Sequence, residues 1–180
     1  MPSSSQIRKK LIQNDKVEAI IVLPRELFIT TDISVTLWIL NQNKKGGNYH
    51  GRNLRNREHE ILFMDLRQWT ENPVKGESKK KVRLVTEQIE RSADIYHTWQ
   101  SVGTDGTNYK VPELYHSVGI AEIESKGWTL TPSKYIEFID HDLDIDYEKE
   151  MDRIQAEMKE VLEQEKKSQQ MLEDAFRGID

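Results

Sequence analysis

The sequence predicts an α/β fold that ends in a long helical tail. Two short runs rich in apolar, β-branched residues, at 17–23 and 35–40, have the length and composition of strands. A helix-like pattern precedes the first run. From Tyr147 onward, apolar residues recur at alternating spacings of four and three, as in a helix of about 30 residues with a heptad seam. These features indicate one α/β core followed by a helical appendage.

The first 70 residues are predicted to form one helix and three strands. Ser5 is a candidate N-cap for a helix over 6–14. Pro24 closes the first strand, which we expect to be buried on both faces. The basic, turn-rich segment 44–59 is expected to be a mobile loop, and 60–66 is expected to be a third strand, at a sheet edge.

The next region, 71–140, is predicted to be helical and irregular. Thr86 can cap a helix over 87–101, a short hairpin is expected at 115–120, and a strand or turn at 128–132. The apolar positions of the helix recur every three to four residues: Ile89, Ala93, Tyr96 and Trp99. The predicted organisation is therefore 1–70, 71–140 and a tail at 141–180.

The tail differs from the rest of the chain in charge. Residues 1–140 carry 20 basic and 18 acidic side chains, a net charge of +2, whereas 141–180 carry 6 and 13, a net charge of −7. An acidic linker is expected to lead into the long helix. The nearly neutral body is compatible with DNA, whereas the acidic tail points to a protein partner. The apolar seam of the tail helix begins at Tyr147 and continues through Met151, Ile154, Met158 and Val161. It is interrupted at Glu165 and Ser168 and resumes at Leu172.

Composition excludes several classes of protein. At 180 residues the chain can bury one core. Charged residues make up 32% of it, the mean hydropathy is −0.74, and no apolar run approaches the roughly 20 residues of a membrane helix. A cytoplasmic location is expected, and the absence of cysteine removes disulfides and thiolate chemistry.

The sequence also lacks the motifs of a self-sufficient enzyme. No glycine-rich turn joins a strand to a helix, and Gly46-Gly47 is better interpreted as a flexible turn. The five histidines never form a metal-spaced pair, and Asp142, Asp144 and Asp146 lack the glycine and glutamate of a calcium loop. We therefore expect no catalytic, cofactor-binding or metal-binding residue within this chain.

Several segments, in order, resemble the modification subunit of type I restriction-modification systems, a DNA adenine-N6 methyltransferase. They are 7–12, 17–24, 27–28 with Thr31 and Ile33, 35–41, 61–67, 89–99, 127–136 and the closing helix, and the resemblance covers nearly the whole chain in order. The resemblance implies the C-terminal end of a Rossmann-like methyltransferase sheet whose last two strands, here 17–23 and 35–40, form an antiparallel pair.

The loop between those strands would then lie at the target-base pocket. The resemblance implies that Phe28 contacts the flipped adenine, with Pro24, Leu27 and Thr31 forming the pocket loop. The alternative is that Leu27 and Phe28 plug the underside of the sheet. The family usually has Thr-Gly-Ile-Pro where this chain has Thr31-Asp32-Ile33-Ser34.

In the family, the S-adenosylmethionine site and the catalytic Asn-Pro-Pro-Phe motif precede this region. The chain contains neither, so we expect one part of the enzyme, from a longer protein or a split gene, that is inactive alone. S-adenosylmethionine would be the cofactor of the complete enzyme only.

The resemblance also implies partners. The tail helix would dock on the specificity subunit through Met151, Ile154, Met158, Val161 and Leu172, within a complex that also holds DNA and a restriction subunit. The alternative is that the seam folds back on its own domain.

Two hypotheses from other classes stay open. One is a stand-alone protein-interaction module built around the heptad helix. The other is nucleic-acid binding, with Lys44, Lys45, Arg52 and Arg55, together with Arg57, contacting DNA phosphates. The alternative for this basic cluster is a solvated loop.

Overall fold

The chain opens with α1 (Ser4–Gln13), which is capped by Ser3. The computed structural model describes residues 3–28, 30–70, 82–139 and 147–177, and the side chains up to 171. The side chain of Ser3 accepts a hydrogen bond from the Gln6 backbone, and the Gln6 side chain accepts one from the Ser3 backbone. The cap is Ser3 rather than the predicted Ser5, because only Ser3 has a glutamine three residues later to complete a capping box.

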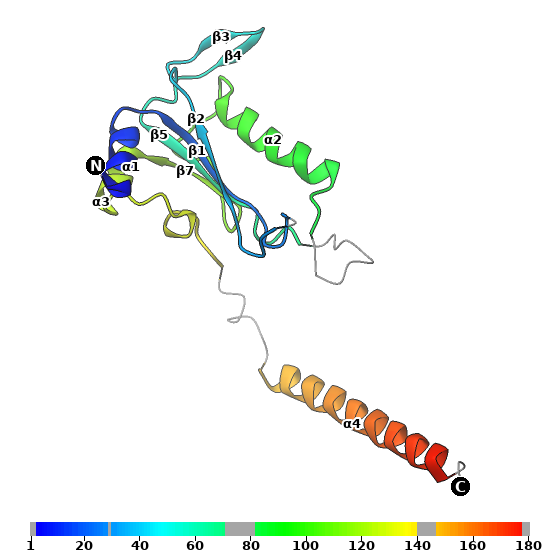
Figure 1. Ribbon diagram of the computed structural model, residues 1–180. Coiled ribbons are helices and arrows are strands. Elements are labelled where there is room, and N and C mark those ends of the chain that lie inside the picture. Colours follow the sequence, from blue (N-terminus) through cyan, green and yellow to red (C-terminus); the bar gives the residue numbers. More distant parts are fainter. Residues whose placement is uncertain (1–2, 29, 71–81, 140–146, 178–180) are drawn as a thin grey trace. The chain divides into compact units, whose positions relative to one another are not determined.

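A five-stranded sheet with the strand order β2-β1-β5-β7-β6 forms the centre of residues 1–139, which we call the sheet unit (Figure 1). All six residues of β1 (Val17–Val22) are buried, as predicted, and β1 pairs antiparallel with β2 (Thr36–Leu40). The prediction of an antiparallel pair at these two segments is confirmed. On its other side β1 pairs in parallel with β5 (Glu60–Asp65).

The prediction that the third strand lies at a sheet edge is wrong. β5 occupies the middle of the sheet, because β7 (Tyr115–Gly119), more than 50 residues later, pairs with its far side. The predicted hairpin within 115–120 is also wrong, because 115–119 is a single strand. β7 instead forms a hairpin with β6 (Lys110–Val111), which lies at one edge of the sheet.

A second correction concerns the expected mobile loop at 44–59. It contains a hairpin of β3 (Gly47–Tyr49) and β4 (Arg52–Leu54). The two connecting residues, His50 and Gly51, both have positive φ angles, 47° and 80°. A two-residue turn with this geometry fits the twist of a hairpin.

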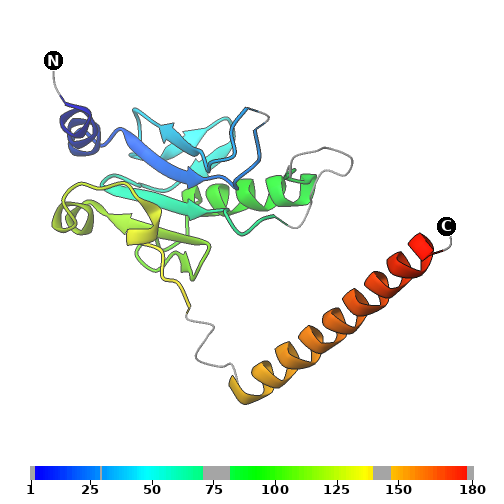
Figure 2. The same cartoon turned by 60° about the horizontal axis from the view of Figure 1, so that its bottom comes forward.

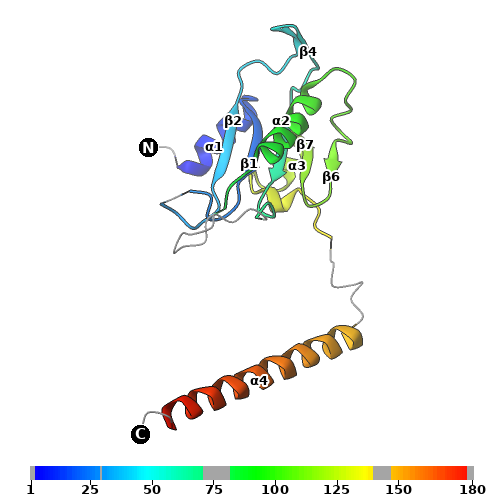
Figure 3. The ribbon, with the colours of Figure 1, turned by 90° about the vertical axis from the view of Figure 1, so that its right-hand side faces the viewer.

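Helices cover both faces of the sheet, as Figures 1 and 3 show. α2 (Thr86–Gln100) packs on one face and buries Ile95 and Trp99. Its N-cap is Val85, so the predicted cap at Thr86 is wrong by one residue, and Ile89, predicted on the apolar face, is exposed. The buried stripe follows Ile95 and Trp99 because four residues separate neighbours on a helix face.

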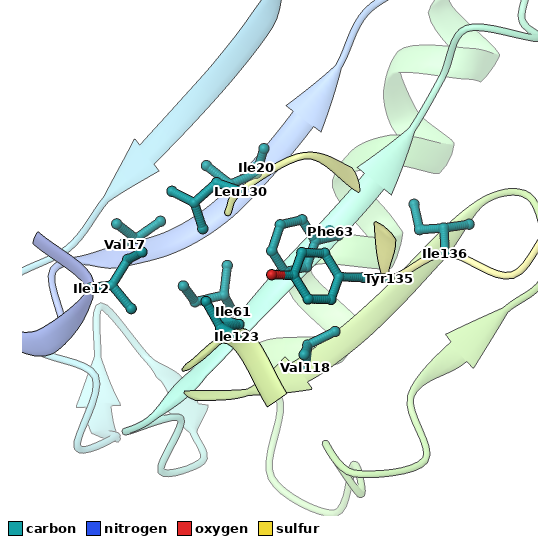
Figure 4. Close-up of a cluster of buried hydrophobic side chains, with 10 residues drawn as sticks. All are labelled: Ile12, Val17, Ile20, Ile61, Phe63, Val118, Ile123, Leu130, Tyr135 and Ile136. Carbon is teal, nitrogen blue, oxygen red and sulfur yellow. The ribbon is translucent and has the colours of Figure 1, made fainter. Parts of the chain in front are cut away.

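The opposite face is covered by α1, α3 (Ile120–Ser125) and the 3-10 helix η1 (Pro132–Lys134). Figure 4 shows the buried cluster there, in which the rings of Phe63 and Tyr135 stack at 4.3 Å between centroids. The segment 128–132, predicted as a strand or turn, begins with a turn at Trp128 and continues without regular structure into η1. α3 was not predicted.

Residues 140–180 form a second unit, separate from 1–139. Its described part is α4 (Tyr147–Arg177), a continuous helix of 31 residues (Figure 2). The prediction of a helix of about this length is confirmed. Across the described residues, no helix is both long and apolar enough to cross a membrane.

Candidate functional site

The connection between β1 and β2 forms a loop at the carboxyl end of β1. Pro24 is buried there, Leu27 and Thr31 are half-buried, and Phe28 is 42% exposed. A bridge between Phe28 and Thr31 narrows the loop, in which the Thr31 backbone donates to the Phe28 carbonyl at 3.4 Å. Part of the surface of Phe28 is therefore accessible to solvent.

A pocket of about 350 Å³ lies beside this loop, at the end of the sheet where the parallel strands β1 and β5 terminate. We call it the carboxyl-end pocket. Its walls combine two guanidinium groups, four hydroxyl groups, one indole and three apolar side chains. The polar and aromatic residues are Arg8, Ser34, Thr36, Trp38, Arg67, Thr131 and Ser133.

Hydrogen bonds fix both arginines of the pocket. The Arg8 Nε donates to the Trp128 carbonyl at 2.9 Å. The Arg67 Nε and Nη2 bind the carboxylate of Asp65, with the shortest contact at 2.5 Å. This ion pair raises the pKa of Arg67, so its guanidinium stays charged at every physiological pH.

The opposite end of the sheet contains a buried carboxylate, Glu18. Its oxygens accept hydrogen bonds from four side chains, at 2.7–3.2 Å: Asn41, Arg57, Tyr96 and Gln100. Burial by itself would raise the pKa of Glu18, but these hydrogen bonds and the charge of Arg57 outweigh it, and the pKa lies below the ordinary value. Glu18 is therefore a charged structural centre between β1 and α2.

The residues predicted to contact DNA phosphates divide into two groups. Lys44 is 2% exposed, and its ammonium donates to the Asp15 carboxylate and to the carbonyls of Val17 and Glu60 at 2.6–3.1 Å. The guanidinium of Arg55 pairs with the Glu60 carboxylate at 2.7 Å and donates to the Trp99 carbonyl.

The prediction is therefore wrong for Lys44, because its ammonium is buried and hydrogen-bonded within the fold. The guanidinium of Arg55 is likewise largely occupied by hydrogen bonds within the fold. Arg57, buried against Glu18, is a third cation of this kind. Lys45 and Arg52 are exposed on and beside the β3–β4 hairpin. These two residues alone, of the four predicted contacts, present their charge to solvent.

Sequence reasoning missed a second pocket, of about 420 Å³, between the hairpin and α2. Four of its ten lining residues have amide side chains, and Tyr49, Arg52 and His97 also line it. Asn41, Tyr96 and Gln100 line it and also donate hydrogen bonds to Glu18.

Every seam residue of α4 whose side chain is described is exposed within its unit. The exposed fractions of Met151, Ile154, Met158 and Val161 range from 48% to 65%. The side chain of Leu172, the fifth predicted partner contact, lies outside the described residues.

Comparison with known proteins identifies the family. Residues 2–143 match the profile of the family described as N-6 DNA Methylase. The chain belongs to this family. The Type I restriction enzyme HindI methylase subunit of Haemophilus influenzae is 30% identical over 161 residues, 88% of this chain and 32% of that protein. The MjaVII methylase subunit of Methanocaldococcus jannaschii is 29% identical over 176 residues, 97% of this chain and 26% of that protein.

This N-6 DNA methylase chain thus spans about a third or less of the length of the curated relatives it matches. A solved type I restriction-modification methyltransferase subunit from Streptococcus thermophilus has the same fold, with a TM-score of 0.56 and 19% identity over 75% of this chain and 23% of that one. The resemblance to type I modification subunits is confirmed.

An N-6 DNA methylase implies S-adenosylmethionine as methyl donor, and the two larger pockets of the sheet unit do not fit it. The donor has a cationic sulfonium and a ribose, and ribose hydroxyls are commonly bound by a carboxylate. Neither the carboxyl-end pocket nor the pocket beside α2 has a carboxylate in its walls that could bind the ribose hydroxyls or balance the charge of the sulfonium. Among the residues with described positions, no cluster of three metal-ligating side chains is present.

The carboxyl-end pocket was not predicted from the sequence. Arg8, Trp38 and Arg67 belong to three separate segments, and only the fold brings them together. One signal was available for Arg67, which follows the end of a parallel strand, where α/β proteins place ligand-binding residues.

Proposed function

We propose that this chain is the part of a type I DNA adenine-N6 methyltransferase subunit that supplies the target-base loop and the helix for the specificity subunit. In this proposal β1 and β2 are the antiparallel pair at the end of the Rossmann-like methyltransferase sheet. The observation that carries it is the accessible ring of Phe28 on a loop at the carboxyl end of β1, in a chain of the N-6 DNA methylase family.

The proposed role of Phe28 is to stack on the extruded adenine. A flipped base loses the stacking of its neighbours, and an aromatic side chain restores about 1 to 3 kcal/mol per base. The burial of Pro24 and the partial burial of Leu27 anchor the loop, and Thr31 closes it through the bridge to Phe28.

The test uses the complete methyltransferase, with this chain joined to the rest of the enzyme and its specificity subunit. Phe28→Ala is expected to slow methyl transfer about tenfold or more, as the loss of about 1.4 kcal/mol or more implies, whereas Phe28→Tyr keeps the ring and most of the activity. Ile33→Ala is the matched control, since it removes an exposed apolar side chain from the same loop. Equal rates for Phe28→Ala and the control enzyme refute the stacking role.

We further propose that the chain alone does not methylate DNA, with the methyl donor bound by the missing part of the enzyme. The poor fit of both pockets to S-adenosylmethionine supports this. Isothermal titration calorimetry of the purified chain with S-adenosylmethionine is expected to give no heat of binding. Binding in the micromolar range contradicts the proposal.

The second element of the proposal is that α4 docks on the specificity subunit, in a complex completed by DNA and a restriction subunit. Four exposed apolar residues at spacings of four and three support it, because such a stripe stabilises a helix only when another apolar surface covers it. Met158→Asp is expected to abolish co-purification with the specificity subunit. Ala156→Asp places the same charge on the opposite face of α4 and serves as the control. Loss of binding in both variants, or in neither, argues against the seam.

A second candidate function is sequence-independent DNA binding by the β3–β4 hairpin. The exposed cations Lys45 and Arg52, with Tyr49 between them, support it. Reversal of both charges is expected to weaken binding of duplex DNA and to reduce its salt dependence. An unchanged salt dependence rules this function out.

A further inference from the structure

The carboxyl-end pocket has the chemistry of an anion site, which neither the family nor the target-base loop explains. Of the ten residues in its walls, two are arginines and none is acidic. The hydroxyl groups of Ser34, Thr36, Thr131 and Ser133 add neutral donors. A pocket with this composition favours a ligand that is negatively charged and rich in hydrogen-bond acceptors.

Both arginines keep donors available for a ligand. Arg67 uses its Nε and Nη2 on Asp65, and its Nη1 has no hydrogen bond to any residue of the described chain. Arg8 uses only its Nε in the described hydrogen bonds. Some N–H groups of each guanidinium thus orient the side chain, and the others can donate to an oxyanion. Arginine binds phosphate in this way, with two N–H groups of one guanidinium.

Trp38 adds an aromatic surface to the same pocket. It lies on β2 opposite Ile20 and is 39% exposed, although it is a large apolar residue. Leu130, another wall residue, lies beside Ile20 in Figure 4. An exposed indole beside two guanidinium groups suits a ligand with one anionic part and one flat or apolar part.

Size and position narrow the ligand further. A volume of about 350 Å³ suits one nucleotide unit rather than a bare phosphate ion. Ser34 belongs to the loop that also carries Phe28, so the pocket adjoins the site proposed for the flipped adenine. The carboxyl ends of parallel strands are where α/β sheets bind ligands.

We propose that the carboxyl-end pocket binds a phosphodiester unit of the DNA strand next to the flipped base, with the phosphate on Arg8 and Arg67 and the sugar or base against Trp38. The identity of the ligand as DNA rests on the proposed function. The binding test does not depend on methylation, however. If Phe28→Ala left the rate of methyl transfer unchanged, the base-stacking role would be refuted, but the proposal for this pocket would still stand.

The experiment measures binding of a labelled, short single-stranded oligodeoxyadenylate to the 180-residue chain by fluorescence anisotropy, at several salt concentrations. Arg8→Gln is expected to weaken binding about tenfold and to reduce the slope of log K against log salt by about 0.7. Arg67→Lys keeps a charge beside Asp65 but loses the fork, and a weakening of several-fold is expected. Lys110→Gln, on the edge strand β6 at the other side of the sheet, removes one charge and serves as the control.

Tryptophan fluorescence gives a second readout. Trp69 and Trp99 are buried, and Trp128 is half-buried but is not a wall residue of the pocket. Quenching by the strand is therefore expected to fall mainly on Trp38 and to be largely lost in Trp38→Phe, whereas Trp128→Phe, the control, keeps it. If Arg67→Lys fails to fold, as shown by circular dichroism, the result of Arg8→Gln decides.

Four outcomes overturn the proposal. The strand does not bind, or it binds equally well to Arg8→Gln and the wild type. Alternatively, Lys110→Gln weakens binding as much as Arg8→Gln does, which indicates general attraction between charges. Finally, deoxyadenosine monophosphate or inorganic phosphate displaces the strand at the concentration at which the strand itself binds, which indicates a site for a free anion.

Discussion

At the scale of single residues, Glu18 has the largest predicted effect on stability. It is buried, and removal of its charge leaves the Arg57 guanidinium in the interior without a carboxylate. Loss of one partner of a buried ion pair costs about 3 to 5 kcal/mol. We expect Glu18→Gln to lower the free energy of unfolding by about 3 kcal/mol in urea titrations near neutral pH. Glu124→Gln, at an exposed carboxylate, is the control, and a similar loss in both variants contradicts this account.

The same carboxylate predicts how stability depends on pH. The folded-state pKa of Glu18 lies below the ordinary value of 4.5, because its hydrogen bonds and the charge of Arg57 outweigh the effect of burial. Its contribution is therefore fully present above pH 4.5 and is lost as the pH falls through the lower folded pKa. Urea titrations in this acid range are expected to show a shallower pH dependence for Glu18→Gln than for the wild type. Identical slopes refute the assignment.

Lys44 and Lys45 are neighbours in sequence with opposite predicted roles. Lys44→Gln removes a buried ammonium that satisfies Asp15 and two carbonyls, so we expect a loss of about 3 kcal/mol of stability. Lys45→Gln, at an exposed position, is expected to change stability by less than about 0.5 kcal/mol and to weaken DNA binding slightly. Thermal unfolding and anisotropy on both variants separate the roles, and equal stability of the two contradicts them.

At the scale of elements, the strands with apolar cores could be predicted and the polar ones could not. The apolar runs of β1, β2 and β5 predicted three strands within one or two residues. The β3–β4 hairpin, Gly-Asn-Tyr and Arg-Asn-Leu, has no alternation of apolar residues because it lies exposed. The central place of β5 depends on β7, and such long-range pairing leaves no local signal.

The candidate site could likewise be predicted in part. The loop with Phe28 could be located because it lies between two predictable strands. The burial of cations in the basic segment could not be predicted, because two of the carboxylates that neutralise them are far away in the sequence. Asp15 lies 29 residues from Lys44, and Glu18 lies 39 residues from Arg57. A run of cations predicts a solvated loop only when no buried carboxylate is available to pair with it.

The hairpin offers a test of its own at Gly46. This residue has a φ angle of +88°, and an added Cβ would lie 2.6 Å from the Leu54 carbonyl oxygen. Gly47 has a similar φ of +106° but open space around it. Both substitutions to alanine are strained, and the close contact is added only at Gly46. Gly46→Ala is therefore expected to destabilise the chain by at least about 1 kcal/mol more than Gly47→Ala in thermal unfolding. Equal effects show that the backbone relaxes.

At the scale of the whole molecule, we expect residues 1–139 to provide the stability of the fold and residues 140–180 to provide most of the negative charge. All residues of both hydrophobic clusters lie between Ile12 and Ile136, so none belongs to 140–180. Residues 1–139 carry 20 basic and 17 acidic side chains, a net charge of +3, against −5 for the whole chain. Truncation after Ile139 thus removes a net charge of −8 without removing any residue of the core.

A chain of 1–139 is expected to unfold within about 0.5 kcal/mol of the full chain in urea, because it keeps the complete sheet and both clusters. It is also expected to bind single-stranded DNA more tightly at low salt, and this gain should vanish as added salt screens the charges. A large fall in stability would show that α4 contributes to the fold of the sheet unit, in favour of the seam folding back on its own domain. If stability is unchanged, the apolar stripe of α4 is available for a partner. If DNA binding is also tighter and sensitive to salt, the acidic residues of α4 weaken DNA binding until the partner is bound.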